Sequence, residues 1–145
     1  MSDLLGVGMS AGTLVTVLTR TSDGLTPFLQ AVREQLAAAP VAHFDETSLR
    51  VASAGAWVHS ASTETLSLFV VHPSRGHEAI MAAGVLPVFA GIAVHDGYTP
   101  YRRYGTAHAL CNAHHLRELA GICDVDPGQV WAQDMIRLLC EINDT

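Results

Sequence analysis

The stretch Val41-Ala42-His43-Phe44-Asp45-Glu46-Thr47 brings an aspartate to the end of an apolar, strand-like run, and Gly91-Ile92-Ala93-Val94-His95-Asp96-Gly97-Tyr98 repeats the arrangement. A carboxylate at the end of a buried strand is costly unless another group pairs with it. Two such carboxylates on adjacent strands repel each other until a divalent cation lies between them. The two runs therefore predict a sheet that carries Asp45 and Asp96 side by side, as metal-dependent phosphoryl chemistry requires.

The composition is that of one globular domain. Of the 145 residues, 49% are hydrophobic and 15% are charged, which is typical of a folded chain rather than a disordered one. The net charge is −6, and every basic residue is an arginine. This acidic balance argues against strong nucleic-acid binding by the chain as a whole. A local basic patch remains possible, because Arg102, Arg103 and Arg117 lie near the Asp96 and His114 segments.

Cysteine usage and the start of the chain indicate a soluble, cytoplasmic protein. The three cysteines form no paired framework, which fits a reducing compartment. Met1-Ser2-Asp3 lacks the positively charged region of a signal peptide. The apolar runs are too short and too interrupted to span a bilayer.

Hydrophobic spacing predicts two N-terminal helices, three short strands, and then alternating helices and strands. Ser10 and Asp23 are expected to cap the first two helices, and Pro40 to end the second. A capping box from Asp126 to Gln129 is expected to open the last helix. The expected strands are 41–51, 56–61, 66–71, 88–94 and about 107–111. A helix is expected at 76–83, between the third and fourth strands, and another at about 113–122, after the fifth.

This order, β-β-β-α-β-α-β-α after N-terminal helices, is that of a ribonuclease H-like α/β domain with a mixed sheet. In that layout the first and fourth strands are neighbours at the centre of the sheet. Asp45 and Asp96 would then face each other.

Several motifs, taken together and in order, resemble the catalytic region of the IS66-type transposase family over about residues 25–119. They are His43-Phe44-Asp45-Glu46-Thr47, Trp57-Val58-His59, His72-Pro73-Ser74-Arg75-Gly76, Gly84-Val85-Leu86-Pro87, His95-Asp96-Gly97-Tyr98 and Cys111-Asn112-Ala113-His114-His115-Leu116-Arg117-Glu118-Leu119. The resemblance implies a DDE-type recombinase with a ribonuclease H-like fold. Such an enzyme cuts transposon ends with two Mg²⁺ or Mn²⁺ ions and joins the freed 3′ hydroxyl to target DNA.

By motif, Asp45 matches the family's first catalytic acid and metal ligand, and Asp96 the second. Cys111 and His114 resemble a C-x-x-H signature found in several transposase superfamilies. The third acid is expected downstream in an Asn-Asn-x-Ala-Glu-Arg segment, and no such string occurs here. The resemblance therefore implies a chain truncated at both ends and inactive alone, with its two-metal site completed only in a full-length protein. Its expected parts are a helical segment at 1–39, a partial catalytic core at 40–123 and the start of a helical insertion at 124–145.

Alternatives stay open for the acidic residues. Asp45 could end a strand and Asp96 begin a turn before Gly97, without any metal. Glu118, on the helix after the fifth strand, is either a substitute for the missing acid or a surface glutamate paired with Arg117 or Arg103. Alternation places Glu46 on the strand face opposite Asp45, where a solvated or ion-paired side chain is expected.

The histidines, tyrosines and N-terminus also allow two interpretations each. Cys111, His114, His115 and His108 lack the spacing of a closed zinc site, so His114 is expected to orient a neighbour or to touch DNA. Tyr98, Tyr101 and Tyr104 either line a DNA surface or cover the sheet edge. The stretch at 6–13 resembles the turn and recognition helix of a helix-turn-helix, but an ordinary capped helix is favoured.

A second function is suggested by the acidic balance and the missing glutamate. The chain would then be a non-catalytic module that binds or dampens full-length transposase. The expected partners are DNA and other copies of the transposase, and no association with a membrane is expected.

Overall fold

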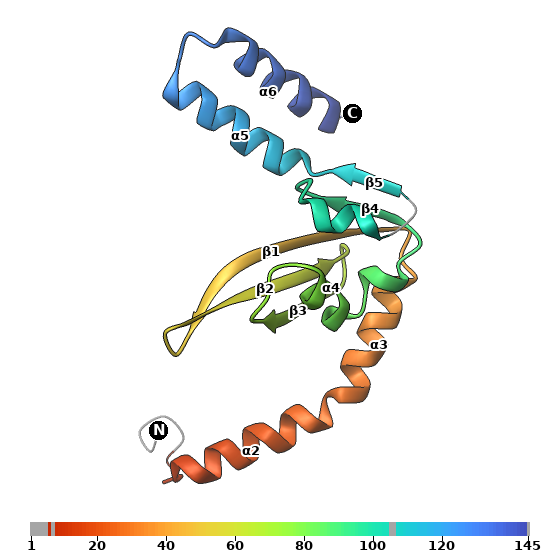
Figure 1. Cartoon of the computed structure of the whole chain (residues 1–145), viewed down its shortest axis with the longest axis vertical. Helices are drawn as coiled ribbons and strands as arrows, with labels where there is room; N and C mark the ends of the chain where they lie inside the picture. The colour runs from red at the N-terminus through yellow and green to blue at the C-terminus, as the bar shows by residue number, and fades with distance from the viewer. Residues whose placement is uncertain (1–5, 7, 105–106, 145) are drawn as a thin grey trace.

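The computed structural model describes residues 6, 8–104 and 107–144. In this part of the chain, a five-stranded mixed sheet has helices before it, within its connections and after it (Figure 1). The strands are β1 (Val41–Val51), β2 (Ala54–Ser62), β3 (Ser67–His72), β4 (Ile92–His95) and β5 (Ala107–Leu110). The helices are α2 (Ala11–Gly24), α3 (Thr26–Ala37), α4 (His77–Ala83), α5 (Asn112–Val125) and α6 (Val130–Asn143), with 3-10 turns η1 (Leu86–Val88) and η2 (Thr99–Arg103).

The longest strand, β1, has the bounds that its residue alternation predicted. Ala42 and Phe44 are buried, whereas Val41, His43 and Asp45 are exposed, so one face of the strand is covered and the other is open. The strand order is β3-β2-β1-β4-β5. β1 pairs antiparallel with β2 and parallel with β4, and β4 pairs parallel with β5. The first and fourth strands are thus neighbours, as expected.

The hydrophobic core lies on the covered face of the sheet. α3 contributes Val32 and Leu36 to it, and Leu36 is completely buried. The rings of Phe44 and Phe89 meet edge to face, with centroids 5.4 Å apart. α4 adds Ile80 to the same cluster and ends at Gly84, whose φ of 74° is the left-handed conformation expected of a helix-ending glycine.

Only one of the two N-terminal caps was predicted correctly. The Ser10 side chain accepts a hydrogen bond from the Thr13 amide and starts α2, so the ordinary capped helix is confirmed for the described residues. Asp23 does not cap α3, because α2 stays helical through Gly24. α3 begins after Leu25 without a side-chain cap, and Pro27 occupies its first turn.

The fourth strand starts later than predicted. Pro87 lies within η1, where a missing amide hydrogen is tolerated, and the chain then turns Phe89 into the core. Regular pairing begins only when the Ile92 amide donates to the Pro40 carbonyl at 2.9 Å. The expectation of a strand from 88 was therefore wrong by four residues.

The C-terminal helices α5 and α6 form a hairpin that extends away from the sheet (Figure 1). The expected capping box is wrong: Asp126 holds the turn by accepting from the Gly128 amide and the Gln129 side chain, and α6 starts only at Val130. Apolar side chains at helical spacing remain exposed on α6, namely Trp131, Met135, Leu138 and Ile142. Among the described residues, no helix combines the length and apolarity needed to cross a membrane.

Candidate functional site

The register of β1 and β4 bears on where Asp45 and Asp96 lie, although β4 itself ends at His95. His43 pairs with Val94 in the parallel β1–β4 ladder, so continuing this register by two residues sets Asp45 opposite Asp96. Alternation puts both on the face opposite Ala42 and Ala93, which are fully buried. Neighbouring strands lie about 4.8 Å apart, so this continued register would put both carboxylates at one open end of the sheet.

Each of these carboxylates accepts a local backbone hydrogen bond through its Oδ1 atom. The Glu46 amide donates to Asp45 at 2.9 Å, and the Tyr98 amide donates to Asp96 at 2.7 Å. The Asp45 side chain is 51% exposed, and its Oδ2 lies 3.8 Å from Nε2 of His114. The alternative in which Asp96 starts a turn is thus compatible with the metal interpretation, because the turn bond uses a single oxygen.

Cys111 and His114 join this end of the sheet from the start of α5. The Cys111 amide donates to the His95 carbonyl at 2.8 Å, which continues the β4–β5 pairing by one residue. Contact with the Cys111 thiol raises the pKa of His114, and Asp45 raises it further, while burial acts against both. Burial pushes the pKa of Cys111 upward, but His114 and the nearby amides outweigh it, so the thiol pKa lies below its ordinary value. Among the residues that the structure describes, none forms a hydrogen bond with the buried Nδ1 of His114.

Arg117 and Glu118 lie further along α5, and both are exposed. Glu118 is one turn beyond His114 and so lies on the same side of the helix. It lines a shallow hollow with Ile122 and Val125 at the α5–α6 turn. Within the described ranges no ion pair joins Glu118 to Arg117 or Arg103, so its role as a substitute acid stays a prediction.

No preformed multidentate metal site is present in the described part of the chain. No three His, Cys, Asp or Glu side chains there are placed to hold an ion together. His108 instead contacts His95, with Nδ1 and Nε2 3.0 Å apart, so it does not join Cys111 and His114. Two adjacent aspartates still suit Mg²⁺, which is commonly held by one or two carboxylates and keeps several waters.

A network around Glu46 was not predicted from the sequence. The Glu46 side chain is only 1% exposed, so the solvated alternative is wrong and the ion-paired one is confirmed. Arg75 donates a hydrogen bond from Nε to Oε1 of Glu46 at 2.8 Å, and its Nη2 forms an ion pair with the same oxygen at 2.8 Å. The Tyr101 hydroxyl donates to Oε2. The guanidinium lies 4.1 Å from the ring centroid of Tyr98 and 4.9 Å from that of Trp57.

This network also decides the position of Tyr101. The ring is buried and its pKa is strongly raised, first by burial and then by the hydrogen bond to Glu46. The Arg75 pKa is raised in turn, chiefly by the same carboxylate. Tyr101 therefore belongs to the core and not to a DNA-facing surface, whereas Tyr98 and Tyr104 are half-buried. The Arg75 motif was visible in the sequence, but its partner 29 residues away was not.

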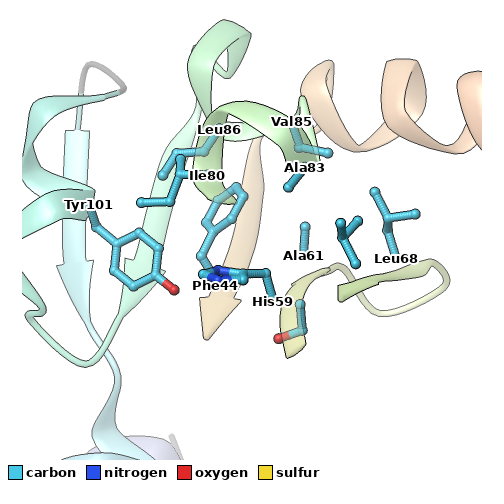
Figure 2. A pocket seen from close by; sticks show the side chains of 11 residues that line it. Phe44, His59, Ala61, Leu68, Ile80, Ala83, Val85, Leu86 and Tyr101 are labelled. Atoms are coloured by element: carbon cyan, nitrogen blue, oxygen red, sulfur yellow. The ribbon is translucent and has the colours of Figure 1, made fainter. Parts of the chain in front are cut away.

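The covered face of the sheet carries a separate, largely apolar hollow (Figure 2). Its lining includes Phe44, His59, Ile80 and Tyr101, and its volume of about 20 Å³ admits roughly one water molecule. The His59 ring contacts the Ser74 carbonyl at 3.3 Å. This hollow lies on the face opposite Asp45 and is too small for a substrate, so it belongs to the core.

His95 is buried, and its protonation gives the stability of the fold a pH dependence. Its Nδ1 accepts from the Gly97 amide at 2.9 Å, so the ring hydrogen is on Nε2 and points at His108. Burial, and then His108, lower the pKa of His95, which keeps the folded ring neutral.

We expect the unfolding free energy contributed by His95 to fall once the pH drops below about 6.5, the ordinary histidine value. Below this pH the histidine of the unfolded chain binds a proton, whereas the folded ring stays neutral. The free energy of unfolding therefore falls by up to about 1.4 kcal/mol per pH unit until the pH passes the folded-state pKa. Urea denaturation between pH 7.5 and 5 measures this slope. A His95→Gln variant should have a shallower slope, and an unchanged slope would contradict the assignment.

One comparison with known proteins, that with protein families, gives a match over nearly the whole chain. The family model described as "Transposase IS66 family" matches residues 1–143. No curated protein and no solved structure gives a significant match.

Proposed function

The chain belongs to the IS66 family of transposases, and on that premise we propose that it carries a ribonuclease H-like catalytic core for DNA transposition. Transposase function in general implies DNA as a partner and a divalent metal as cofactor. The proposed fold is supported by the strand order β3-β2-β1-β4-β5, with antiparallel pairing on one side of β1 and parallel pairing on the other. Its proposed parts are the helices of 1–39, the core of 40–123 and a helical insertion from 124.

The cation site of this proposal consists of Asp45 and Asp96. The observation that carries it is the parallel pairing of β1 with β4 up to His43 and Val94, because continuing it by two residues would bring Asp96, just beyond the end of β4, level with Asp45. Bound Mg²⁺ or Mn²⁺ would activate an attacking oxygen and stabilise a leaving one on the DNA phosphate. The chain's own part is to hold two carboxylates together at a solvent-accessible point. His114 offsets part of the charge of Asp45, and exposed Arg117 is suited to a DNA phosphate.

Mn²⁺ binding tests this site directly. We expect the unmodified chain to bind Mn²⁺ weakly, and Asp45→Asn and Asp96→Asn each to weaken binding at least about tenfold, because loss of even an outer-shell partner commonly costs 10–100-fold. Electron paramagnetic resonance of free Mn²⁺ measures the affinity. Asp23→Asn removes the same charge from an exposed position in α2 and serves as the control. Unchanged affinity in both site variants would refute the assignment.

We further propose that this chain alone gives little cleavage or strand transfer, because the family's third acid has no matching motif in its sequence. Incubation with Mg²⁺ and a plasmid carrying the transposon ends tests this expectation. Clear nicking or joining would overturn it, and a Glu118→Gln variant would then show whether Glu118 supplies the third carboxylate.

A second candidate function is that of a module that binds full-length transposase or itself. It is supported by the exposed apolar side chains on α6, a helix with only Ala132 buried among its described residues. Co-purification with an intact homologue is the expected result. Monomeric behaviour together with no association would exclude this candidate.

A further inference from the structure

The burial of Glu46 requires an explanation beyond fold stability. An ionised carboxylate that is 1% exposed is costly, and buried ion pairs stabilise folds little compared with apolar side chains of similar size. Glu46 directly follows Asp45 on β1 and points to the covered face of the sheet. Any group that binds the Glu46 side chain therefore also fixes the position of the part of β1 that carries Asp45.

Of the two side chains that bind Glu46, Tyr101 comes from the segment that follows Asp96, and Arg75 contacts that segment through Tyr98. The hydroxyl of Tyr101, in η2, donates to Glu46. Tyr98 stacks on Arg75, which donates to Glu46 from the β3–α4 connection. The amide of the same Tyr98 donates to the Asp96 carboxylate at 2.7 Å. A continuous chain of contacts thus joins the residue after Asp45 to the carboxylate of Asp96.

Asp96 lies just beyond the last residue of β4 and so outside the paired part of the sheet. β4 ends at His95, and Gly97 adopts a φ of 94°, which turns the backbone away. Asp45 is held within β1 by ladder pairing with β2, whereas the Asp96 carboxylate is held by the amide of Tyr98 in the following turn.

We propose that Glu46, Arg75, Tyr98 and Tyr101 form a positioning network that fixes the Asp96 carboxylate beside Asp45. This inference rests on the proposed function of the two aspartates as a cation site. The four residues do not touch the cation themselves. They act through the hydrogen bond from the Tyr98 amide to Asp96 and through the hydrogen bond from Tyr101 in η2 to Glu46 in β1.

Tyr101→Phe and Glu46→Gln test the network. The first removes one hydroxyl and keeps the ring in the core, and the second keeps the shape and an acceptor for Tyr101. We expect each variant to bind Mn²⁺ about tenfold more weakly than the unmodified chain, since outer-shell changes of this kind cost 10–100-fold. Val32→Ala is the control for a general loss of stability, because Val32 is a buried core residue of α3. It should bind Mn²⁺ as the unmodified chain does.

Amide hydrogen exchange supplies a readout that does not depend on the metal. The Tyr98 amide should exchange about tenfold faster in Tyr101→Phe, while amides in the β2–β3 pairing keep their protection. A merely structural role would instead accelerate amides throughout the sheet by a common factor.

The outcomes separate this inference from the proposed function. Weaker Mn²⁺ binding in the folded network variants, with Val32→Ala unaffected, supports the network. Unchanged binding in both folded variants, or uniform acceleration of exchange, overturns the network and leaves the aspartate site intact. Failure of the unmodified chain to bind Mn²⁺ overturns the cation site itself, and this inference with it.

Discussion

Replacing Phe44 with alanine is expected to lower the free energy of unfolding by about 3–5 kcal/mol, the upper range for a single core substitution. The side chain is 5% exposed, and its ring meets Phe89 edge to face. It also borders the small hollow of Figure 2, which the substitution would enlarge. Because packed neighbours relax only partly, the new cavity adds to the lost burial. Urea denaturation followed by circular dichroism measures the loss.

The adjacent residue supplies the matched control. Asp45 lies on the open face of the same strand and is half exposed. Asp45→Ala should change stability by no more than about 0.5 kcal/mol, as is usual for surface positions. Similar losses in the two variants would contradict the assignment of Phe44 and Asp45 to opposite faces of β1.

Elements fixed by local pattern could be predicted from the sequence. The alternation of β1 gave its bounds at 41–51, and Gly84 marked the end of α4, because the left-handed turn after a helix suits glycine. The neighbouring positions of β1 and β4 followed from the order of the elements.

Elements that depend on tertiary contacts could not be predicted in the same way. The run at 88–94 is apolar throughout, yet its first part turns Phe89 into the core and only Ile92–His95 pairs. Asp23 has the chemistry of a cap but lies inside α2, because nothing local stops that helix before Gly24. Apolar content alone does not distinguish a strand from a buried turn.

The candidate site shows the same division. Asp45 and Asp96 were predicted to be neighbours, because each ends a short apolar run. The structure confirms that β1 and β4 are adjacent, and the side-by-side placement of the two carboxylates stays a prediction. The Glu46–Arg75 pair was missed, since alternation gives the face of Glu46 but not the partner that another connection supplies. For Tyr101 the sequence left a DNA surface and cover of the sheet edge open, and its burial excludes the first.

Gly91→Ala is the second change for which we expect a large effect, a loss of about 3 kcal/mol or more. A Cβ atom at this position would lie 2.5 Å from the Pro40 carbonyl oxygen and 2.6 Å from that of Ala39. Both atoms belong to the backbone entering β1, so no side-chain rotation can relieve the clash. Overpacking usually costs about 1–3 kcal/mol, and more when the backbone itself must move.

Gly121→Ala is the control, because a Cβ atom on Gly121 would meet nothing within 4 Å and the residue is in the interior of α5. Alanine there should stabilise the chain by up to about 1 kcal/mol. The two glycines thus predict shifts of opposite sign in the same thermal melt, and a stable Gly91→Ala variant would refute the close approach of β4 to the start of β1. Since that approach sets the β1–β4 register, we also expect the Gly91 variant to bind Mn²⁺ more weakly. The spacing of Asp45 and Asp96 depends on the same two strands.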